Sequence, residues 1–498
     1  MKKLISLWAI LICFVYMHCP THAQTVQASE TDYYTNEIGI NAIVRTDSIN
    51  HSGTLIYYED AIGRSYFLYR KDDAAGTTYK YLWPNHTLLN FHKFTIHDMV
   101  IQKSHCFFCG TYTDVPNSTT KGLVGCITLD HIEYTPAILA DIDIYLCTIP
   151  DTKEFTQMDA HQSTGGFQIC LVGQSTSTTS PSCAAFVEWQ NPNWSYRVVE
   201  VQDPNETMTD IAFSGLGTKI VAVSRYNNEP YKFGLRGEYT SNLFSFGTPI
   251  SPIISFTHRN TVNTQGLYLA STSNPYPTWH DNNIVARIVC PPNSEEFTVA
   301  YECVDATKVC ETQRQVALFR IDISTFPWNY NMNLTGKQIV HGYFEESSTF
   351  TDMIYIPYNK HFALLHRSGN SSNGKSTAVQ FPSWLGYGQI NTLISDIDLH
   401  SSMSVKLKNN IYWLNLVGNN QSDSKVCYFQ QNLDVMKESC YMTHPMSLSE
   451  ELLETDWSTY QGIRDVNDNN HYDKLGYSTT IYASGTPWDN KCTSYRIQ

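Results

Sequence analysis

Aspartates recur in this sequence in a pattern that could place several carboxylates together. Five stretches fit the template apolar-x-Asp-[Ile/Met]-x-apolar, and their acidic residues are Asp98, Asp141, Asp210, Asp352 and Asp396. Carboxylates at equivalent places around an axis could hold a cation. Each could instead accept backbone N–H groups at the start of a strand and tie neighbouring units together. One aspartate per unit favours the second, structural interpretation.

The cysteines could bind a metal, carry redox chemistry or form disulfides. Cys106 and Cys109 are spaced as Cys-x-x-Cys, but residues three apart in a strand point to opposite faces, which excludes a shared metal. A redox pair needs a helix N-terminus to lower a thiol pKa, and none is expected here. Disulfides across hairpins or short loops are the favoured interpretation. The candidate pairs are Cys109 with Cys126, Cys170 with Cys183, Cys303 with Cys310, and Cys427 with Cys440. Cys106, Cys147, Cys290 and Cys492 have no assigned partner.

One Asn/Asp-rich segment has the ligand types that calcium prefers. Oxygen-bearing side chains stand at positions 1, 3, 5 and 9 of "DVNDNNHYD", namely Asp465, Asn467, Asn469 and Asp473. The segment departs from the EF-hand loop, with Asn470 where Gly is needed and Gly476 where a bidentate Glu is needed. Calcium binding and a plain Asn/Asp turn are both open interpretations. No other cofactor is expected.

Familiar catalytic signatures are missing from the sequence. It has no Gly-x-Ser-x-Gly, no His-Glu-x-x-His and no Gly-rich phosphate loop. No catalytic residue is therefore assigned. A glycosidase needs only two suitably spaced carboxylates, and 47 acidic residues cannot be sorted into such a pair by sequence. Hydrolysis is not excluded.

The elements that position these residues are short strands in a repeated order. Each Asp-[Ile/Met] strand is followed by a second strand, often closed by glycine, as in "CFFCG" 106–110 and "ICLVG" 169–173. Third strands such as "GLVGCITL" 122–129 follow, and a degenerate first strand lies at Ile284–Val289. A four-stranded antiparallel unit repeating every 40 to 70 residues predicts an all-β fold, a β-propeller.

Seven four-stranded blades give the best fit, with six, eight or another all-β architecture as alternatives. We expect one propeller domain over 24–498, with blades near 36–84, 95–135, 139–202, 208–250, 284–341, 350–393 and 394–443. A C-terminal segment, 444–498, should close the ring through "CTSYRIQ" 492–498, because an open ring leaves an unpaired strand edge.

The first 23 residues have the features of a secretory signal peptide. Lys2 and Lys3 precede an apolar run from Leu4 to Tyr16, and Ala23 ends a small-residue cleavage site. A lipid anchor at Cys19 is disfavoured because bulky residues precede that cysteine. We expect an exported protein, located in the periplasm, at the cell surface or outside the cell. No later segment is apolar enough to span a membrane.

Charge restricts the partners. Removing 1–23 leaves 31 basic against 47 acidic residues, so the net charge changes from −14 to −16. An acidic chain without a basic run repels phosphate backbones and anionic membranes, which disfavours nucleic acid as a partner. A protein or a glycan is the expected partner. The oligomeric state is left open.

The repeated Asp-[Ile/Met] strand starts and the "FFCG…GLVGCI" hairpin resemble the uncharacterised exported β-propeller-type proteins of Bacteroidetes. The resemblance covers most of the mature chain and implies an exported propeller without supplying an activity. We therefore expect a non-enzymatic binding or scaffold module that recognises its partner through a loop face. The alternative is a carbohydrate-active hydrolase or lyase with acidic residues at the central channel.

Overall fold

The structure is a computed structural model. It describes residues 30–38, 40–47, 53–59, 65–71, 78–82, 92–129, 144–229, 232–244, 256–263, 286–305, 313–322, 333–340, 349–357, 361–367, 375–382, 391–398, 400–408, 411–419 and 425–432. Within this part the chain is almost all strand, and its one helix is the single turn α3 (Thr240–Leu243). No helix in these ranges is both long enough and apolar enough to cross a membrane.

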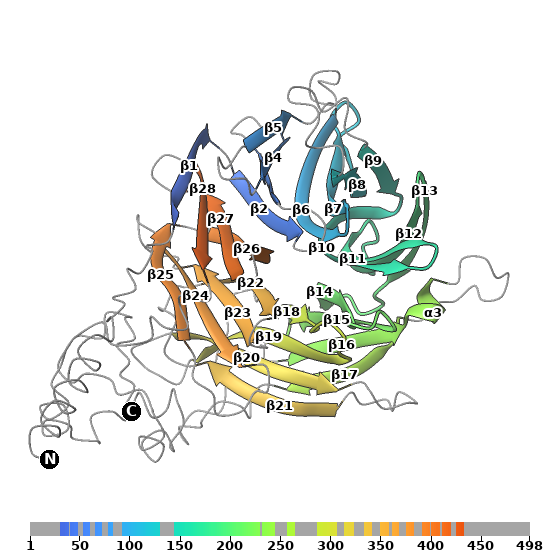
Figure 1. The fold of residues 1–498 in the computed structure, drawn as a ribbon. Helices are drawn as coiled ribbons and strands as arrows, with labels where there is room; N and C mark the ends of the chain where they lie inside the picture. Colours follow the sequence, from blue (N-terminus) through green and yellow to red (C-terminus); the bar gives the residue numbers. More distant parts are fainter. Residues whose placement is uncertain are drawn as a thin grey trace, which may run out of the picture.

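The strands form seven four-stranded antiparallel sheets, which Figure 1 shows arranged around a common axis as in a β-propeller. The inner strands are β2 (Ile40–Asp47), β6 (His92–Gln102), β10 (Thr152–Ser163), β14 (Glu206–Phe213), β18 (Ala286–Val289), β22 (Thr349–Ile356) and β26 (His400–Lys408). The second strands are β3 (Gly53–Glu59), β7 (His105–Asp114), β11 (Gly166–Ser175), β15 (Lys219–Tyr226), β19 (Glu296–Asp305), β23 (His361–Arg367) and β27 (Ile411–Asn419).

The remaining strands complete each sheet toward the outside. The third strands are β4 (Ser65–Lys71), β8 (Thr119–Thr128), β12 (Ser182–Gln190), β16 (Lys232–Tyr239), β20 (Gln313–Asp322), β24 (Lys375–Pro382) and β28 (Lys425–Asn432). The outer strands are β5 (Thr78–Leu82), β9 (Ile144–Ile149), β13 (Asn193–Glu200), β17 (His258–Asn263), β21 (Asn333–Val340), β25 (Asn391–Asp398) and β1 (Glu30–Ile38). The prediction of four-stranded antiparallel units is confirmed.

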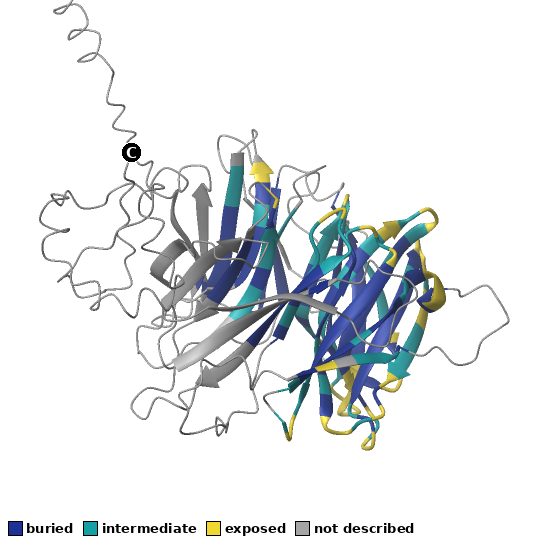
Figure 2. Ribbon diagram, turned by 90° about the horizontal axis from the view of Figure 1, so that it is seen from below, coloured by how far each residue is buried: buried dark blue, intermediate teal, exposed yellow. Residues whose placement is uncertain are grey.

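The core lies between neighbouring sheets, because the central strands bury both of their faces. On β7, Cys106 and Phe108 belong to the cluster shared with the first sheet, whereas Phe107 and Cys109 belong to the cluster shared with the third. Full burial of each phenylalanine contributes about 1.5–3 kcal/mol. Figure 2 shows the same pattern, with buried strand centres and exposure concentrated at the turns. This two-sided burial explains why the second strands read as unbroken apolar runs.

A bulge near the middle of the inner strand explains the glycine that closes the second strand. The register shifts between Ile96 and Asp98 on β6, and Gly110 on β7 lies opposite that point. A Cβ on Gly110 would collide with the carbonyl oxygen of Thr95. Gly173 faces the bulge of β10 in the same way and would meet the carbonyl oxygen of Glu154. The glycines are needed because the bulged backbone approaches them closely.

Replacing Gly110 by alanine is therefore expected to lower the free energy of unfolding by about 1–3 kcal/mol, because neither backbone can yield without breaking the ladder. Urea unfolding followed by tryptophan fluorescence measures the change. Gly165→Ala is the matched control, since its Cβ would meet only Gln190 Nε2 at 3.4 Å, an ordinary contact. Equal stability of the two variants would contradict the role given to the bulge.

The last sheet corrects the expected closure. Its fourth strand is β1, from the N-terminal side of the chain, which pairs with β28 in the register Tyr33 to Tyr428 and Tyr34 to Cys427. The predicted closing strand 492–498 and the rest of 444–498 lie outside the described residues. The last sheet does need a closing strand, as expected, but both ends of the chain have strand-like sequence. Alternation alone does not choose between them.

Three predicted unit boundaries also differ from the sheets. The second sheet runs on to Ile149 through β9, so the third begins at Thr152 rather than at 139. The fourth sheet takes its outer strand β17 from beyond residue 250. Asn391–Asp398 is the outer strand of the sixth sheet, so the seventh begins at His400 rather than at 394. Outer strands were the faintest signal in the sequence, and they account for all three shifts.

Candidate functional site

Three of the repeated aspartates occupy the same place, directly after the inner-strand bulge of the second, fourth and sixth sheets. In each, one carboxylate oxygen accepts the N–H of the following residue and the other accepts an N–H from the next inner strand. The cross-strand bonds run from Met158 N to Asp98 Oδ2 (3.0 Å), from Ile288 N to Asp210 Oδ2 (2.9 Å), and from Met403 N to Asp352 Oδ2 (2.9 Å). The structural interpretation of these three residues is confirmed.

The other four junctions between inner strands are bridged by different residues. Asp159 on β10 accepts the N–H of Phe213 at 2.8 Å, and Arg287 on β18 donates to the carbonyl of Thr351 at 3.1 Å. Ser402 Oγ on β26 accepts the N–H of Val44 at 3.2 Å. Arg45 on β2 donates to Asp98 Oδ1 at 2.6 Å. Every junction between consecutive inner strands, including that from β26 back to β2, therefore carries a polar bridge.

The two remaining aspartates of the template do not join this set. Asp141, expected at the start of the third unit, lies outside the described residues; the inner strand of the third sheet is β10, where Gln157 holds the place after the bulge. Asp396 lies on β25, an outer strand, so its assignment to the start of the seventh unit was wrong. The template recurs by chance at Asp396 because apolar-x-Asp-Ile-x-apolar also suits an ordinary alternating strand.

Burial raises the pKa of two bridging carboxyls to about 7. For Asp159, burial is partly offset by the N–H groups of Phe213 and Ala160, and for Asp210 by the charge of Arg287 and two backbone N–H groups. The pKa of Asp352 is also raised by burial, against the charge of Arg45. Because these folded-state pKa values lie above that of an unfolded aspartate, the folded state is favoured where the carboxyl is protonated.

Stability is therefore expected to fall as the pH rises from about 4 through 7, by at most about 1.4 kcal/mol per pH unit for each carboxyl. Urea unfolding midpoints at pH 5, 6, 7 and 8 measure this slope. Asp159→Asn should give a shallower slope, because the amide does not titrate, although it loses one backbone acceptor. Asp114→Asn, at the half-exposed end of β7, is the control. A slope unchanged by Asp159→Asn would contradict the assignment.

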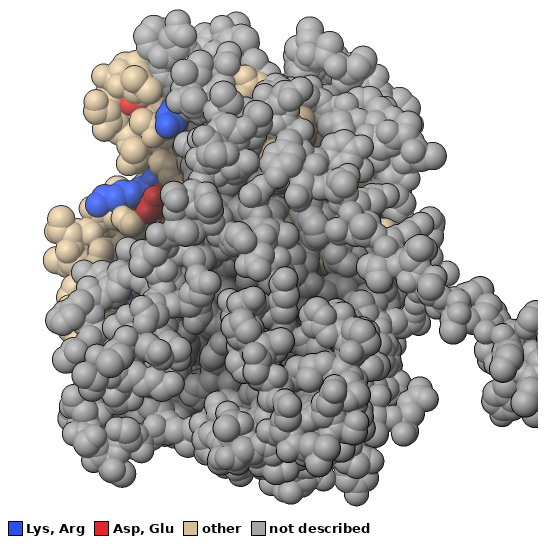
Figure 3. Space-filling model, turned by 90° about the vertical axis from the view of Figure 1, so that its left-hand side faces the viewer, with Lys and Arg blue, Asp and Glu red and all other residues tan. Residues whose placement is uncertain are grey.

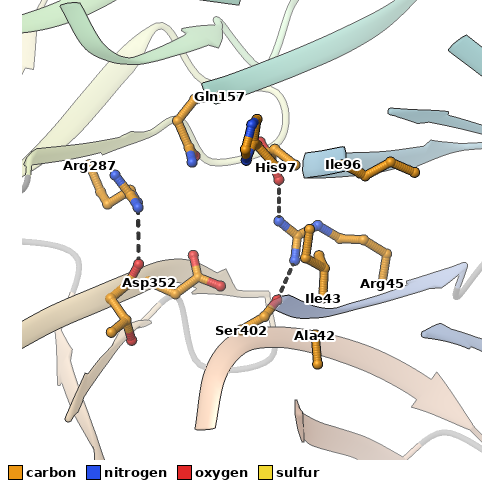
Figure 4. Close-up of a pocket in the computed structure, with 11 residues that line it drawn as sticks. Ala42, Ile43, Arg45, Ile96, His97, Gln157, Arg287, Asp352 and Ser402 are labelled. Atoms are coloured by element: carbon orange, nitrogen blue, oxygen red, sulfur yellow. Dashed lines mark hydrogen bonds and ion pairs between the residues drawn. The ribbon is translucent and has the colours of Figure 1, made fainter. Parts of the chain in front are cut away.

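A pocket of about 190 Å³ opens on the axis between the inner strands (Figure 4). Its lining comes from six of the seven inner strands and is mostly polar. The lining residues are Ala42, Ile43, Arg45, Ile96, His97, Asp98, Gln157, Arg287, Thr351, Asp352 and Ser402. Figure 4 shows the side chains of Gln157, Arg287, Arg45 and Asp352 converging on the same central space. The site thus combines two guanidinium groups, two carboxylates and an amide.

Arg45 is held by protein acceptors at Nε, Nη1 and Nη2. It contacts Asp98, the carbonyls of Val44 and Met99, and Ser402 Oγ at 2.8 Å. Burial alone would lower the pKa of Arg45, but the charges of Asp98 and Asp352 outweigh it and raise the pKa. The Arg45–Asp98 pair is a fixed, neutral unit in the wall of the pocket.

His97 lies half-buried at the pocket edge. Its Nε2 is 3.1 Å from Thr111 Oγ1 and 3.8 Å from Glu154. Burial, which outweighs the nearby charge of Glu154, lowers the pKa of His97. The ring is therefore neutral at pH 7 and can act as a hydrogen-bond donor or acceptor.

The cysteines that the structure describes with their side chains are free thiols: Cys106, Cys109, Cys126, Cys147, Cys170, Cys183 and Cys290. Two predicted disulfides are therefore absent. Cys109 lies opposite Val124, which makes Cys126 a diagonal neighbour about 7–8 Å away, too far for a bond that needs Cβ atoms about 4 Å apart. Cys170 and Cys183 point to opposite faces of their sheet.

The remaining cysteine and calcium candidates are not placed. Cys303 on β19 and Cys427 on β28 belong to described strands without described side chains, and their expected partners Cys310 and Cys440 lie outside the described residues. The calcium candidates Asp465, Asn467, Asn469 and Asp473 also lie outside them. Among the residues that the structure does describe, no three His, Cys, Asp or Glu side chains gather as a metal site.

Sequence reasoning missed Gln157, Arg287 and Ser402 as pocket residues, although a signal was present. "FTQM" 155–158 keeps the apolar-x-x-Met frame of the template with Gln in place of Asp, whereas "HSSM" 400–403 keeps only the Met, because His400 replaces the apolar residue. The degenerate copy at 284–289 was recognised, but its arginine was not weighed. Searching for the frame rather than for the acid would have found Gln157 and Arg287, but not Ser402.

Comparisons with known proteins give distant structural similarities only. No protein-family model matches the chain, and no curated protein sequence matches it. A chain of the mitotic checkpoint complex is similar with a TM-score of 0.45 and 10% identity, over 81% of this chain and 91% of that one. The polysaccharide lyase Uly1 gives 0.44 and 8%, over 79% and 90%. A prolyl endopeptidase gives 0.40 and 9%, over 82% of this chain and 50% of that longer one.

Proposed function

We propose that this protein is an exported, seven-bladed β-propeller that binds a small polar ligand, as part of a protein or glycan, in its axial pocket. The N-terminal leader supports export. The seven polar bridges between consecutive inner strands, including β26 to β2, support a closed ring of seven blades. The similarity of the strand motifs to exported propeller-type proteins of Bacteroidetes agrees with this assignment.

One observation carries the choice of binding over hydrolysis. Both oxygens of Asp98 and of Asp352 accept backbone N–H groups, so the two carboxylates that line the pocket are committed to holding strands together. An acid–base pair needs carboxyls that exchange protons with a substrate. On the described part of the face in Figure 3, basic and acidic side chains lie next to each other rather than forming a patch of one charge. The proposed ligand recognition therefore does not depend on a charged outer surface there.

The test is a binding screen on arrays of glycans and short peptides with the secreted form of the protein, followed by incubation of each bound compound and analysis of products by mass spectrometry. We expect saturable binding of one ligand class with no change in its mass. Binding to no compound would overturn the proposal, and so would conversion of a bound glycan to shorter products.

The second candidate is a carbohydrate-active hydrolase or lyase. His97 favours it, because a neutral imidazole at the pocket edge is suited to removing a proton from a bound sugar. His97→Ala should then abolish product formation without abolishing binding. If the wild-type protein forms no product from any bound glycan, this candidate fails.

A further inference from the structure

Arg287 retains hydrogen-bonding capacity toward the axial pocket. Its guanidinium donates from Nη1 to the carbonyl of Ala286 and from Nη2 to the carbonyl of Thr351, both at 3.1 Å. A guanidinium has five N–H groups, so three are left for another acceptor. Within the described residues no carboxylate contacts it, in contrast to Arg45, which pairs with Asp98, and Arg236, which pairs with Glu206.

Gln157 offers further donors at the same place. It follows the bulge of β10, where the second, fourth and sixth sheets have aspartate, and its side chain points into the pocket beside Arg287 (Figure 4). No hydrogen bond holds its amide among the described residues. An amide presents two N–H donors and a carbonyl. The N–H donors of Arg287 and Gln157 that make no hydrogen bond within the described residues therefore face the same cavity.

The negative charges around this point are partly offset. Asp98 is neutralised by direct contact with Arg45. Asp210 and Asp352 are the carboxyls that interact electrostatically with Arg287; Asp210 is buried and Asp352 half-buried, and desolvation raises the pKa of each. The pKa of Asp210 is raised to about 7, so its protonation when an anion enters would further reduce repulsion. The remaining polar residues that line this part of the pocket are the neutral His97, Thr351 and Ser402.

The pocket also contains acceptors for hydroxyl groups. Each oxygen of Asp352 accepts one backbone N–H, and a carboxylate oxygen has about two acceptor positions. The cavity of about 190 Å³ is on the scale of one sugar ring.

We propose that the axial pocket binds a sugar acid, a small hydroxylated monocarboxylate, with its carboxylate on Arg287 and Gln157 and its hydroxyls toward Asp352 and Ser402. This inference rests on the proposed binding function and names its ligand class. The planar fork of Arg287 matches a carboxylate, which makes the interaction both strong and oriented. The ligand is a terminal unit of an acidic glycan or the free sugar acid.

The experiment is a titration by calorimetry with four probes: glucuronate, galacturonate, glucose and N-acetylglycine. We expect a uronate to bind at least 10-fold more tightly than glucose, which lacks the charge, and than N-acetylglycine, which lacks the hydroxyls. Arg287→Met should weaken uronate binding by about 10- to 100-fold, the range for a lost hydrogen bond to a charged group. Arg287→Lys should fall between, because a point charge replaces the fork.

Two further variants make the result decisive. Gln157→Asp places in β10 the residue that three other inner strands tolerate at this site, so it should fold, and its added carboxylate should abolish uronate binding. Arg197→Met makes the same substitution as Arg287→Met, but on the outer strand β13, and should leave affinity unchanged. Thermal unfolding midpoints verify folding of each variant.

Equal affinity for glucuronate and glucose, or uronate binding unaffected by Gln157→Asp and Arg287→Met, would overturn the inference. Equal affinity for N-acetylglycine would also overturn it, in favour of a peptide carboxyl terminus. No binding of either uronate, alongside array binding of a neutral glycan, would reject the sugar acid and leave the binding propeller standing. No ligand on the arrays at all would reject the proposed function itself.

Discussion

Asp98→Ala is expected to lower the free energy of unfolding by about 3–5 kcal/mol, the largest effect of any single substitution considered for this protein. The substitution removes the partner of Arg45 and leaves a guanidinium uncompensated in the wall of the axial pocket. It also orphans the N–H groups of Met99 and Met158, which belong to two different sheets. Urea unfolding at pH 7, with fluorescence and circular dichroism as independent probes, gives the change.

A double-mutant cycle separates the ion pair from the amide bridges. Arg45→Met with Asp98→Ala should cost less than the sum of the two single changes, because the double variant contains no unpaired buried charge. Asp114→Ala, in an exposed hairpin of the same sheet, is the matched control and should change stability by less than about 0.5 kcal/mol. Asp98→Ala as stable as this control would show that the junction does not depend on the carboxylate.

Removal of β1 should have the second-largest effect. A chain beginning at Ile40 lacks the fourth strand of the last sheet and exposes the edge of β28. Each lost backbone hydrogen bond contributes about 1 kcal/mol, so the loss amounts to several kcal/mol, and the open edge should promote self-association. Thermal unfolding and light scattering, compared with a chain beginning at Glu30, measure the two consequences.

The same truncation allows a rescue experiment. A synthetic peptide spanning 30–38 supplies the missing strand in trans and should restore the unfolding midpoint in a concentration-dependent way. A peptide of the same composition in scrambled order is the control. If the chain beginning at Ile40 is as stable and monodisperse as the longer chain, then β1 does not latch the last sheet.

Much of the fold could be predicted from the sequence because its strongest signals are local. Two-sided burial turns second and third strands into apolar runs such as "CFFCG", and these runs marked the repeated unit correctly. Outer strands have one exposed face and little side-chain signal, so β9, β17 and β25 were missed or misassigned. Strand closure by β1 depends on pairing between segments almost 400 residues apart, which local alternation cannot reveal.

The pocket was harder to predict for a different reason. Its residues come one to three at a time from strands spread between Ala42 and Ser402, and the proposed ligand-binding residues depart from the repeated pattern. The aspartates were identified because they repeat. They repeat because several sheets use them for the same structural contact, the acceptance of backbone N–H groups between inner strands. Arg287 and Gln157 occupy the position that aspartate occupies in three other inner strands, so a search for aspartate does not find them. The pairing of cysteines failed similarly, because a hairpin's register decides which thiols meet.

The seven junctions use aspartate, arginine and serine in unlike geometries, and this has an evolutionary consequence. If the units arose by duplication of an ancestral segment, they have since lost the ability to substitute for one another. Transplanting the fifth unit into the position of the second would bring Arg287 where Asp98 must receive an amide, and both flanking contacts would fail. The seven units share one architecture, but each fits only between its own two neighbours.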